Sequence, residues 1–189
     1  ATEIAELLPG RALLLLGDAA SLDRVEEEIP GHAILHFATH GVAWPDDPLG
    51  SFLALSDGAL TVRGFLERAR SRASVKEPEA AETNSTRARG VTDLVVLSAC
   101  QTGLGQITGD GVIGLTRAFL IAGARSVIVS LWSVDDDATR ALMVAFYRHY
   151  LELGNKAVAL QRAMLEVRGV DGWGEARFWA PFVLVGAAR

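Results

Sequence analysis

A short apolar strand that gives way at once to a polar loop does most to limit what this chain can fold into. Leu94–Leu97 reads LVVL, and residues 98–103 (SACQTG) follow it directly, before a glycine-broken loop and an expected helix. Residues 33–39 form a second apolar segment, which ends in the same way at His40. In open α/β sheets, ligands and chemistry collect at the carboxyl ends of strands. We therefore expect a site where these two segments end.

The rest of the chain alternates segments typical of strands with segments typical of helices. Strands are expected at 12–16, 33–39, 94–97, 125–132 and 181–185, with a hairpin over 52–62. Helices are expected after Ser21, after Val62, over about 111–122 and 136–153, and from about Asn155. This alternation predicts an α/β fold with a mostly parallel sheet and helices on both faces.

One segment interrupts the pattern. Residues 70–90 (RSRASVKEPEAAETNSTRARG) contain Val75 as their only large apolar side chain. Such a composition buries too little apolar surface to offset the entropy lost on ordering. We interpret the segment as an exposed insertion within a single domain that covers residues 1–189.

Composition excludes several classes of function. The net charge of −5 argues against a nucleic-acid-binding face, which would need to be basic. The apolar run at 12–16 is far too short to span a membrane. The chain has one cysteine, so it forms no internal disulfide, which favours a reducing, cytoplasmic setting.

That cysteine, Cys100, and His40 are the candidates for chemistry. A cysteine attacks as the thiolate, and a neighbouring imidazole lowers the thiol pKa and later protonates the leaving group. The alternative is that Cys100 is a small core residue, as lone cysteines often are. Residues 98–101 (SACQ), with His40 sixty residues upstream (100 − 40), approximate the caspase signature and favour the catalytic interpretation.

Two other motifs suggest different functions. On a helix, His36 and His40 would form a zinc-binding pair, but residues 33–39 are rich in strand-forming residues and no further ligands can be assigned. We expect His36 to be a buried, hydrogen-bonded histidine that supports the site.

Residues 109–114 (GDGVIG) match the dinucleotide-binding pattern G-x-G-x-x-G. The pattern needs its first glycine directly after a strand, however, whereas Gly109 lies well beyond Ser98.

Taken in order, these blocks resemble the CHAT domain, a caspase-like domain often found behind TPR repeats. The resemblance is carried by HFATHG at 36–41, LSACQTG at 97–103, GDG at 109–111, AGARSV at 122–127, SLWSVDD at 130–136 and WAPF at 179–182. The family is grouped with caspases, gingipains and separases. The resemblance implies that His40 is the base, that Cys100 is the nucleophile, and that the backbone N–H groups of Gly41 and Cys100 form the oxyanion hole. Family members usually carry a further stretch of sheet before the part matching residues 1–31, and we expect this chain to lack it.

The sequence therefore predicts a cysteine endopeptidase that needs no cofactor and acts on a protein or peptide substrate. Residues 131–136 (LWSVDD) resemble the separase stretch that supplies an acidic pocket for arginine. Asp136 is the first candidate for that pocket, Asp135 the second and Asp110 the third, which predicts cleavage after a basic residue. The alternative is a catalytically silent CHAT-type interaction module, with TPR repeats as possible partners; a dinucleotide-binding domain is the other alternative.

Overall fold

A computed structural model describes most of the chain. It covers residues 1–42, 44, 46–47, 49–74, 92–98, 109–132 and 134–189, with the backbone alone for 69–74 and 109–114. Most of the insertion predicted at 70–90 therefore lies outside the described residues, and so does Cys100.

The centre of the fold is a four-stranded sheet. Its strands, in spatial order, are β1 (Ile34–Phe37), β5 (Leu94–Leu97), β6 (Ser126–Ser130) and β7 (Phe182–Gly186). The first three run parallel, and β7 pairs antiparallel with β6. All residues of β5 and β6 are buried, which explains why their sequences, LVVL and SVIVS, do not alternate between apolar and polar residues. The predicted mostly parallel sheet is confirmed.

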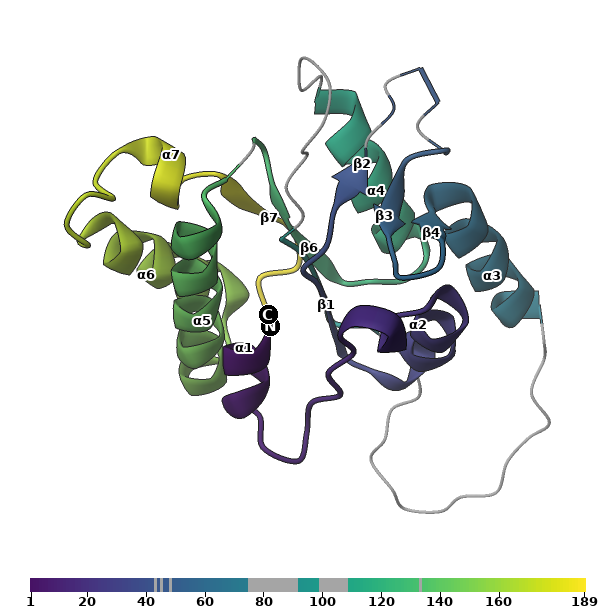
Figure 1. Cartoon of the computed structure of the whole chain (residues 1–189), viewed down its shortest axis with the longest axis horizontal. Helices are drawn as coiled ribbons and strands as arrows, with labels where there is room; N and C mark the ends of the chain where they lie inside the picture. Colours follow the sequence, from purple (N-terminus) through teal and green to yellow (C-terminus); the bar gives the residue numbers. More distant parts are fainter. Residues whose placement is uncertain (43, 45, 48, 75–91, 99–108, 133) are drawn as a thin grey trace.

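Helices cover both faces of this sheet, as predicted (Figure 1). One face carries α2 (Leu22–Glu28), α3 (Val62–Ser74) and α4 (Gly109–Ile121), and the other carries α1 (Thr2–Glu6), α5 (Asp136–Leu153), α6 (Lys156–Arg168) and α7 (Ala176–Trp179). A hydrophobic core lies on each face of the sheet: the first under α2, α3 and α4, and the second under α5 and α6. Side chains of β5 alternate between them, because Val95 and Leu97 belong to the first core and Leu94 and Val96 to the second.

A small antiparallel sheet continues from the end of β1. It consists of β2 (Gly41–Val42), β3 (Phe52–Ala54) and β4 (Ala59–Thr61), in that order. Strands β3 and β4 form the hairpin predicted over 52–62. Leu53 and Leu60 lie opposite each other and are almost fully buried, so this small sheet is fixed to the first core.

The strand predicted at 12–16 is wrong. This segment has no regular secondary structure and belongs to neither sheet, and Leu13 and Leu16 are 45% and 55% exposed. Within the described ranges β1 pairs with β5 only, so its other edge is unpaired and this segment does not add a strand to it. An apolar run predicts burial but cannot specify a strand partner.

Two short helices, α1 and α7, and the 3-10 turns at Gly17–Ala19 and Ile29–Gly31 were not predicted.

Side-chain caps fix the starts of the helices. Ser21, Asp135 and Asn155 each accept a bond from the backbone N–H three residues on, which satisfies one of the free donors at each helix start. The long helix predicted over 136–153 is confirmed as α5, and Gly154 ends it in the left-handed conformation. None of the helices in the described ranges is both long and apolar enough to cross a bilayer.

A buried ion pair closes the amino end of the sheet. Lys156 is fully buried, and its Nζ lies 2.9 Å from Oδ1 of Asp93, while the hydroxyl of Tyr150 donates to Oδ2 at 3.0 Å. Burial acts to raise the pKa of Asp93, but the bonds from Lys156 and Tyr150 outweigh it and hold that pKa below its usual value. This cluster lies at the opposite end of the strands from His40 and is structural.

Candidate functional site

His40 is held at the carboxyl end of the sheet by the neighbouring hairpin. It lies three residues after Phe37, the last residue of β1, and it is exposed. The backbone N–H of Ala54 in β3 donates to the carbonyl of His40 at 2.7 Å. The hydroxyl of Thr39 donates to the carbonyl of Ala54 at 2.5 Å. Two bonds to one residue of β3 thus fix the backbone that carries the imidazole.

Ser98 marks the end of the neighbouring strand. It follows β5 directly, and its N–H donates to the carbonyl of Phe37 at 3.1 Å, which extends the β1–β5 ladder by one step. Its hydroxyl donates to the same carbonyl at 3.4 Å and lies 2.8 Å from Nε2 of His36. Cys100 follows two residues later, outside the described residues.

His36 links this rim to helix α5. Its Nδ1 lies 3.1 Å from the hydroxyl of Tyr147, and the two rings stack with their centroids 5.6 Å apart. Burial, reinforced by the positive amino terminus, lowers the pKa of His36 to about 4, so the imidazole is neutral near pH 7. Burial also raises the pKa of Tyr147, which keeps its phenol protonated. The expectation that His36 is hydrogen-bonded is confirmed, and both ring nitrogens are engaged, which leaves neither directed at a metal ion.

A cavity of about 460 Å³ opens at the same rim. Its lining combines the residues just described with the start of α5, and includes His36, His40, Ser98, Asp136, Thr139 and Arg140. The structure therefore brings Asp136 and His40 to one cavity. Because the carboxylate and the imidazole border the same space, a bound chain could contact both.

The other predicted site residues are placed differently. Asp135 caps α5, where its carboxylate accepts from the N–H of Ala138 at 2.9 Å. Asp110 lies in the first turn of α4, but its side chain is outside the described part of the structure. Gly41 begins β2 and is buried beside His40. Gly109 begins α4 twelve positions after β5 ends at Leu97 (109 − 97), so the glycine motif does not follow its strand directly.

The sequence analysis missed Thr139 and Tyr147. Thr139 is only 9% exposed, and its Oγ1 has no hydrogen-bond partner in the part of the chain that the structure describes. It lines the cavity one turn after Asp136, and Tyr147 lies two turns further along α5. Thr139 lies three positions after Asp136 on the same face of the helix, and this spacing is a signal that could have identified it. Next to Thr139, Arg140 pairs with Glu3 of α1 at 2.6 Å.

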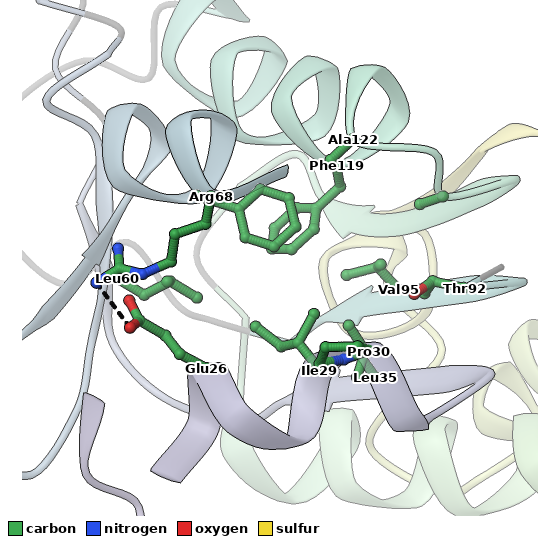
Figure 2. A pocket seen from close by; sticks show the side chains of 12 residues that line it. Glu26, Ile29, Pro30, Leu35, Leu60, Arg68, Thr92, Val95, Phe119 and Ala122 are labelled. Carbon is green, nitrogen blue, oxygen red and sulfur yellow. Dashed lines mark ion pairs between the residues drawn. The ribbon is translucent and has the colours of Figure 1, made fainter. Parts of the chain in front are cut away.

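A second cavity, of about 170 Å³, lies on the other face of the sheet (Figure 2). Arg68 of α3 and Glu26 of α2 form an ion pair of 2.7 Å beside it, and apolar side chains such as Ile29 and Phe119 make up much of its lining. It reaches Thr92, just before β5, and is therefore directed towards the amino ends of the parallel strands. Chemistry in such sheets collects at the opposite ends, where His40 and Asp136 lie.

Comparison with known proteins identifies the family. The family model described as the CHAT domain matches residues 1–187. Tetratricopeptide repeat protein 28 of Mus musculus is 32% identical over 196 residues, and that of Homo sapiens is 30% identical over 192 residues. In both, the match covers 92% of this chain but only 8% of the relative, so the chain corresponds to a small part of those proteins. The chain belongs to the CHAT domain family, which is part of the caspase-like peptidase group.

Proposed function

We propose that this chain is a cysteine endopeptidase with His40 as base and Cys100 as nucleophile. The supporting observation is the register of two neighbouring parallel strands. Ile34 pairs with Leu94 and Phe37 with Leu97, so partners are offset by 60 positions (94 − 34). His40 and Cys100 are separated by the same 60 positions, so in the sequence each comes three positions after the last residue of its strand. An imidazole base and a thiol that follow neighbouring strands at corresponding positions are suited to act together as general base and nucleophile.

The chemistry proposed for this pair is acyl transfer. His40 takes the proton of the Cys100 thiol, and the thiolate attacks the carbonyl carbon of the scissile peptide bond. The N–H groups of Gly41 and Cys100 stabilise the resulting oxyanion. The protonated His40 then gives its proton to the leaving amine as the C–N bond breaks, which leaves a thioester on Cys100. Water, deprotonated by His40, hydrolyses this thioester and restores the thiol.

We propose further that the cleaved bond follows a basic residue, with arginine preferred. Asp136 borders the same cavity as His40, and a carboxylate can pair with a guanidinium through two parallel bonds. The buried Oγ1 of Thr139 can accept one further N–H in that cavity. Asp135 is a weaker candidate because it already caps α5, and Asp110 would have to act from α4. TPR repeats are proposed as the regulatory partner in a longer protein.

The test is hydrolysis of a fluorogenic peptide library that varies the residue before the scissile bond. Wild type is expected to cleave after Arg and Lys, and Cys100→Ala and His40→Ala are each expected to abolish cleavage without lowering the melting temperature. If wild type cleaves no peptide and both variants fold normally, the silent interaction module becomes the better account. If either variant cleaves at the wild-type rate, the proposed mechanism is wrong.

A further inference from the structure

We propose that Tyr147, His36 and Ser98 form a hydrogen-bonded positioning relay that sets the relative placement of the two strand ends leading to His40 and Cys100. This inference rests on the proposed function, because it concerns the geometry of the same pair. It assigns no catalytic role to the three side chains. They act by holding the residues that carry the chemistry.

The relay joins three elements that are far apart in the sequence. Tyr147 lies on α5, His36 on β1, and Ser98 immediately after β5. The contacts are 3.1 Å from Tyr147 to Nδ1 of His36 and 2.8 Å from Nε2 of His36 to Ser98. Tyr147 is 1% exposed, so the relay starts from a side chain that the second core holds in place.

Ser98 ties the two strands together. Its N–H and its hydroxyl both donate to the carbonyl of Phe37, at 3.1 Å and 3.4 Å. From that point His40 lies three residues beyond Phe37, and Cys100 lies two residues beyond Ser98. Because so few residues separate the tie from the pair, a shift of Ser98 relative to Phe37 is passed on to the distance between base and thiol.

In the proposed relay each group donates a hydrogen bond to the next, from Tyr147 through His36 and Ser98 to the carbonyl of Phe37. A serine hydroxyl has one hydrogen, and here it is directed to the Phe37 carbonyl. In the His36 tautomer that completes the relay, the serine oxygen accepts from Nε2–H, and Nδ1 accepts from the Tyr147 hydroxyl. Every member is uncharged in this arrangement, consistent with the lowered pKa of His36 and the raised pKa of Tyr147. The imidazole therefore acts as a neutral bridge and does not compete with His40 for the thiol proton.

The chain offers matched controls at the other end of the same sheet. Ser126 is fully buried at the start of β6, and its hydroxyl donates to the carbonyl of Asp93 at 2.7 Å. Tyr150, almost one turn after Tyr147 on α5, donates to the Asp93 carboxylate at 3.0 Å. Ser126→Ala and Tyr150→Phe therefore remove the same chemical groups as Ser98→Ala and Tyr147→Phe, but far from the rim.

Two readouts separate the relay from the peptidase proposal. The first is the rate of alkylation of Cys100 by iodoacetamide between pH 5 and 9, which reports the thiolate of the only cysteine in the chain without requiring turnover. The second is kcat and KM for a fluorogenic peptide with arginine before the scissile bond. Small misplacements of reacting groups cost up to about 100-fold in rate. We expect Ser98→Ala and Tyr147→Phe each to lower kcat by about 10- to 100-fold with little change in KM.

The same two variants are expected to slow alkylation at pH 7 by about tenfold, because the thiol loses its neighbouring imidazole and its pKa rises. Ser126→Ala and Tyr150→Phe should retain wild-type rates even if they unfold at lower temperature. The double variant Ser98→Ala/Tyr147→Phe should be no slower than either single variant, since both break one relay. As a further check, His36→Gln keeps a donor and an acceptor and should retain more activity than His36→Leu.

The outcomes distinguish the two proposals. If wild-type Cys100 is alkylated as an ordinary thiol with a pKa near 8.5 and no peptide is cleaved, the peptidase proposal fails and the relay with it. If wild-type Cys100 is activated but Ser98→Ala and Tyr147→Phe behave like their controls at the amino end of the sheet, the relay alone is overturned. Fully additive losses in the double variant would also contradict a single connected relay.

Discussion

Asp136 and His40 line one cavity although 96 positions separate them in the sequence (136 − 40). Asp136 is in the first turn of α5, and His40 lies beyond the end of β1. The parallel sheet creates this proximity, because β1 and the strand that leads into α5 both end at the same rim. Under the proposed function, a substrate bound at the imidazole would also meet this carboxylate.

The carboxylate predicts a dependence on basic substrates. Asp136→Asn should lower kcat/KM for a substrate with arginine before the scissile bond by about 10- to 100-fold, since a charge-assisted pair is lost. Asp137→Asn is the matched control, because Asp137 is 78% exposed and does not line the cavity. Peptide-library kinetics provide the measurement. A wild-type preference for aspartate at that position would contradict the specificity proposal.

Thr139 predicts a conflict between stability and recognition. Its buried hydroxyl lacks a hydrogen-bond partner among the described residues, so the nearly isosteric change Thr139→Val should stabilise the fold by about 1 kcal/mol. The same change should lower kcat/KM for arginine substrates several-fold, whereas Thr139→Ser should retain it. Denaturant titration and peptide kinetics on both variants provide the test. A destabilised Thr139→Val variant would indicate that the hydroxyl has a partner after all.

His36 predicts a specific loss of stability in mild acid. Its pKa is lowered from 6.5 to about 4 in the folded state, so between these values the unfolded chain binds the proton and the folded chain does not. Stability should therefore fall as pH drops from 6.5 towards 4, by up to about 3 kcal/mol, and should not change through this group above 6.5.

The measurement is urea unfolding at pH 7, 6 and 5 for wild type and His36→Gln. Other titratable and charged groups line the same cavity, namely the amino terminus at Ala1, Glu3, His40, Asp136 and Arg140. Because the variant retains all of them, the difference between the two pH profiles isolates His36. Parallel profiles between pH 7 and 5 would show that the imidazole is not held neutral by the fold.

The ion pair between Asp93 and Lys156 at the amino end of the sheet predicts that the two partners contribute unequally to the free energy of unfolding. Asp93→Ala leaves Lys156 fully buried without its carboxylate and should cost about 3–5 kcal/mol. Lys156→Met should cost less, because Asp93 is 25% exposed and retains its bond from Tyr150. Chemical denaturation of the two variants gives both values. Equal losses would mean that Lys156 reaches solvent or another acceptor when Asp93 is removed.

Much of the architecture could be predicted because its signals are local. The runs LVVL in β5 and SVIVS in β6 indicate strands that are buried on both faces, and the caps at Ser21 and Asn155 mark helix starts. The run at 12–16 is the exception, because β pairing depends on a partner that the run itself does not encode.

The site was predictable only in part, for a related reason. His40 and Asp136 stand out at strand and helix ends, where sequence patterns change. The bonds from Ala54 and Tyr147 that support the rim join positions far apart in the chain. Tyr147 in particular resembles any other residue on the apolar face of α5. Its hydroxyl acquires a role only when α5 packs against β1.

Intact-mass labelling with a peptidyl-arginyl chloromethyl ketone tests the central claim most directly. Such a reagent occupies the substrate site and alkylates an activated thiolate. We predict one adduct per chain, mapped to Cys100, that is blocked by a competing arginine peptide and is lost or greatly slowed in His40→Ala. The absence of labelling in folded wild type, or equally fast labelling in His40→Ala, would contradict the claim that His40 and Cys100 act as a catalytic pair.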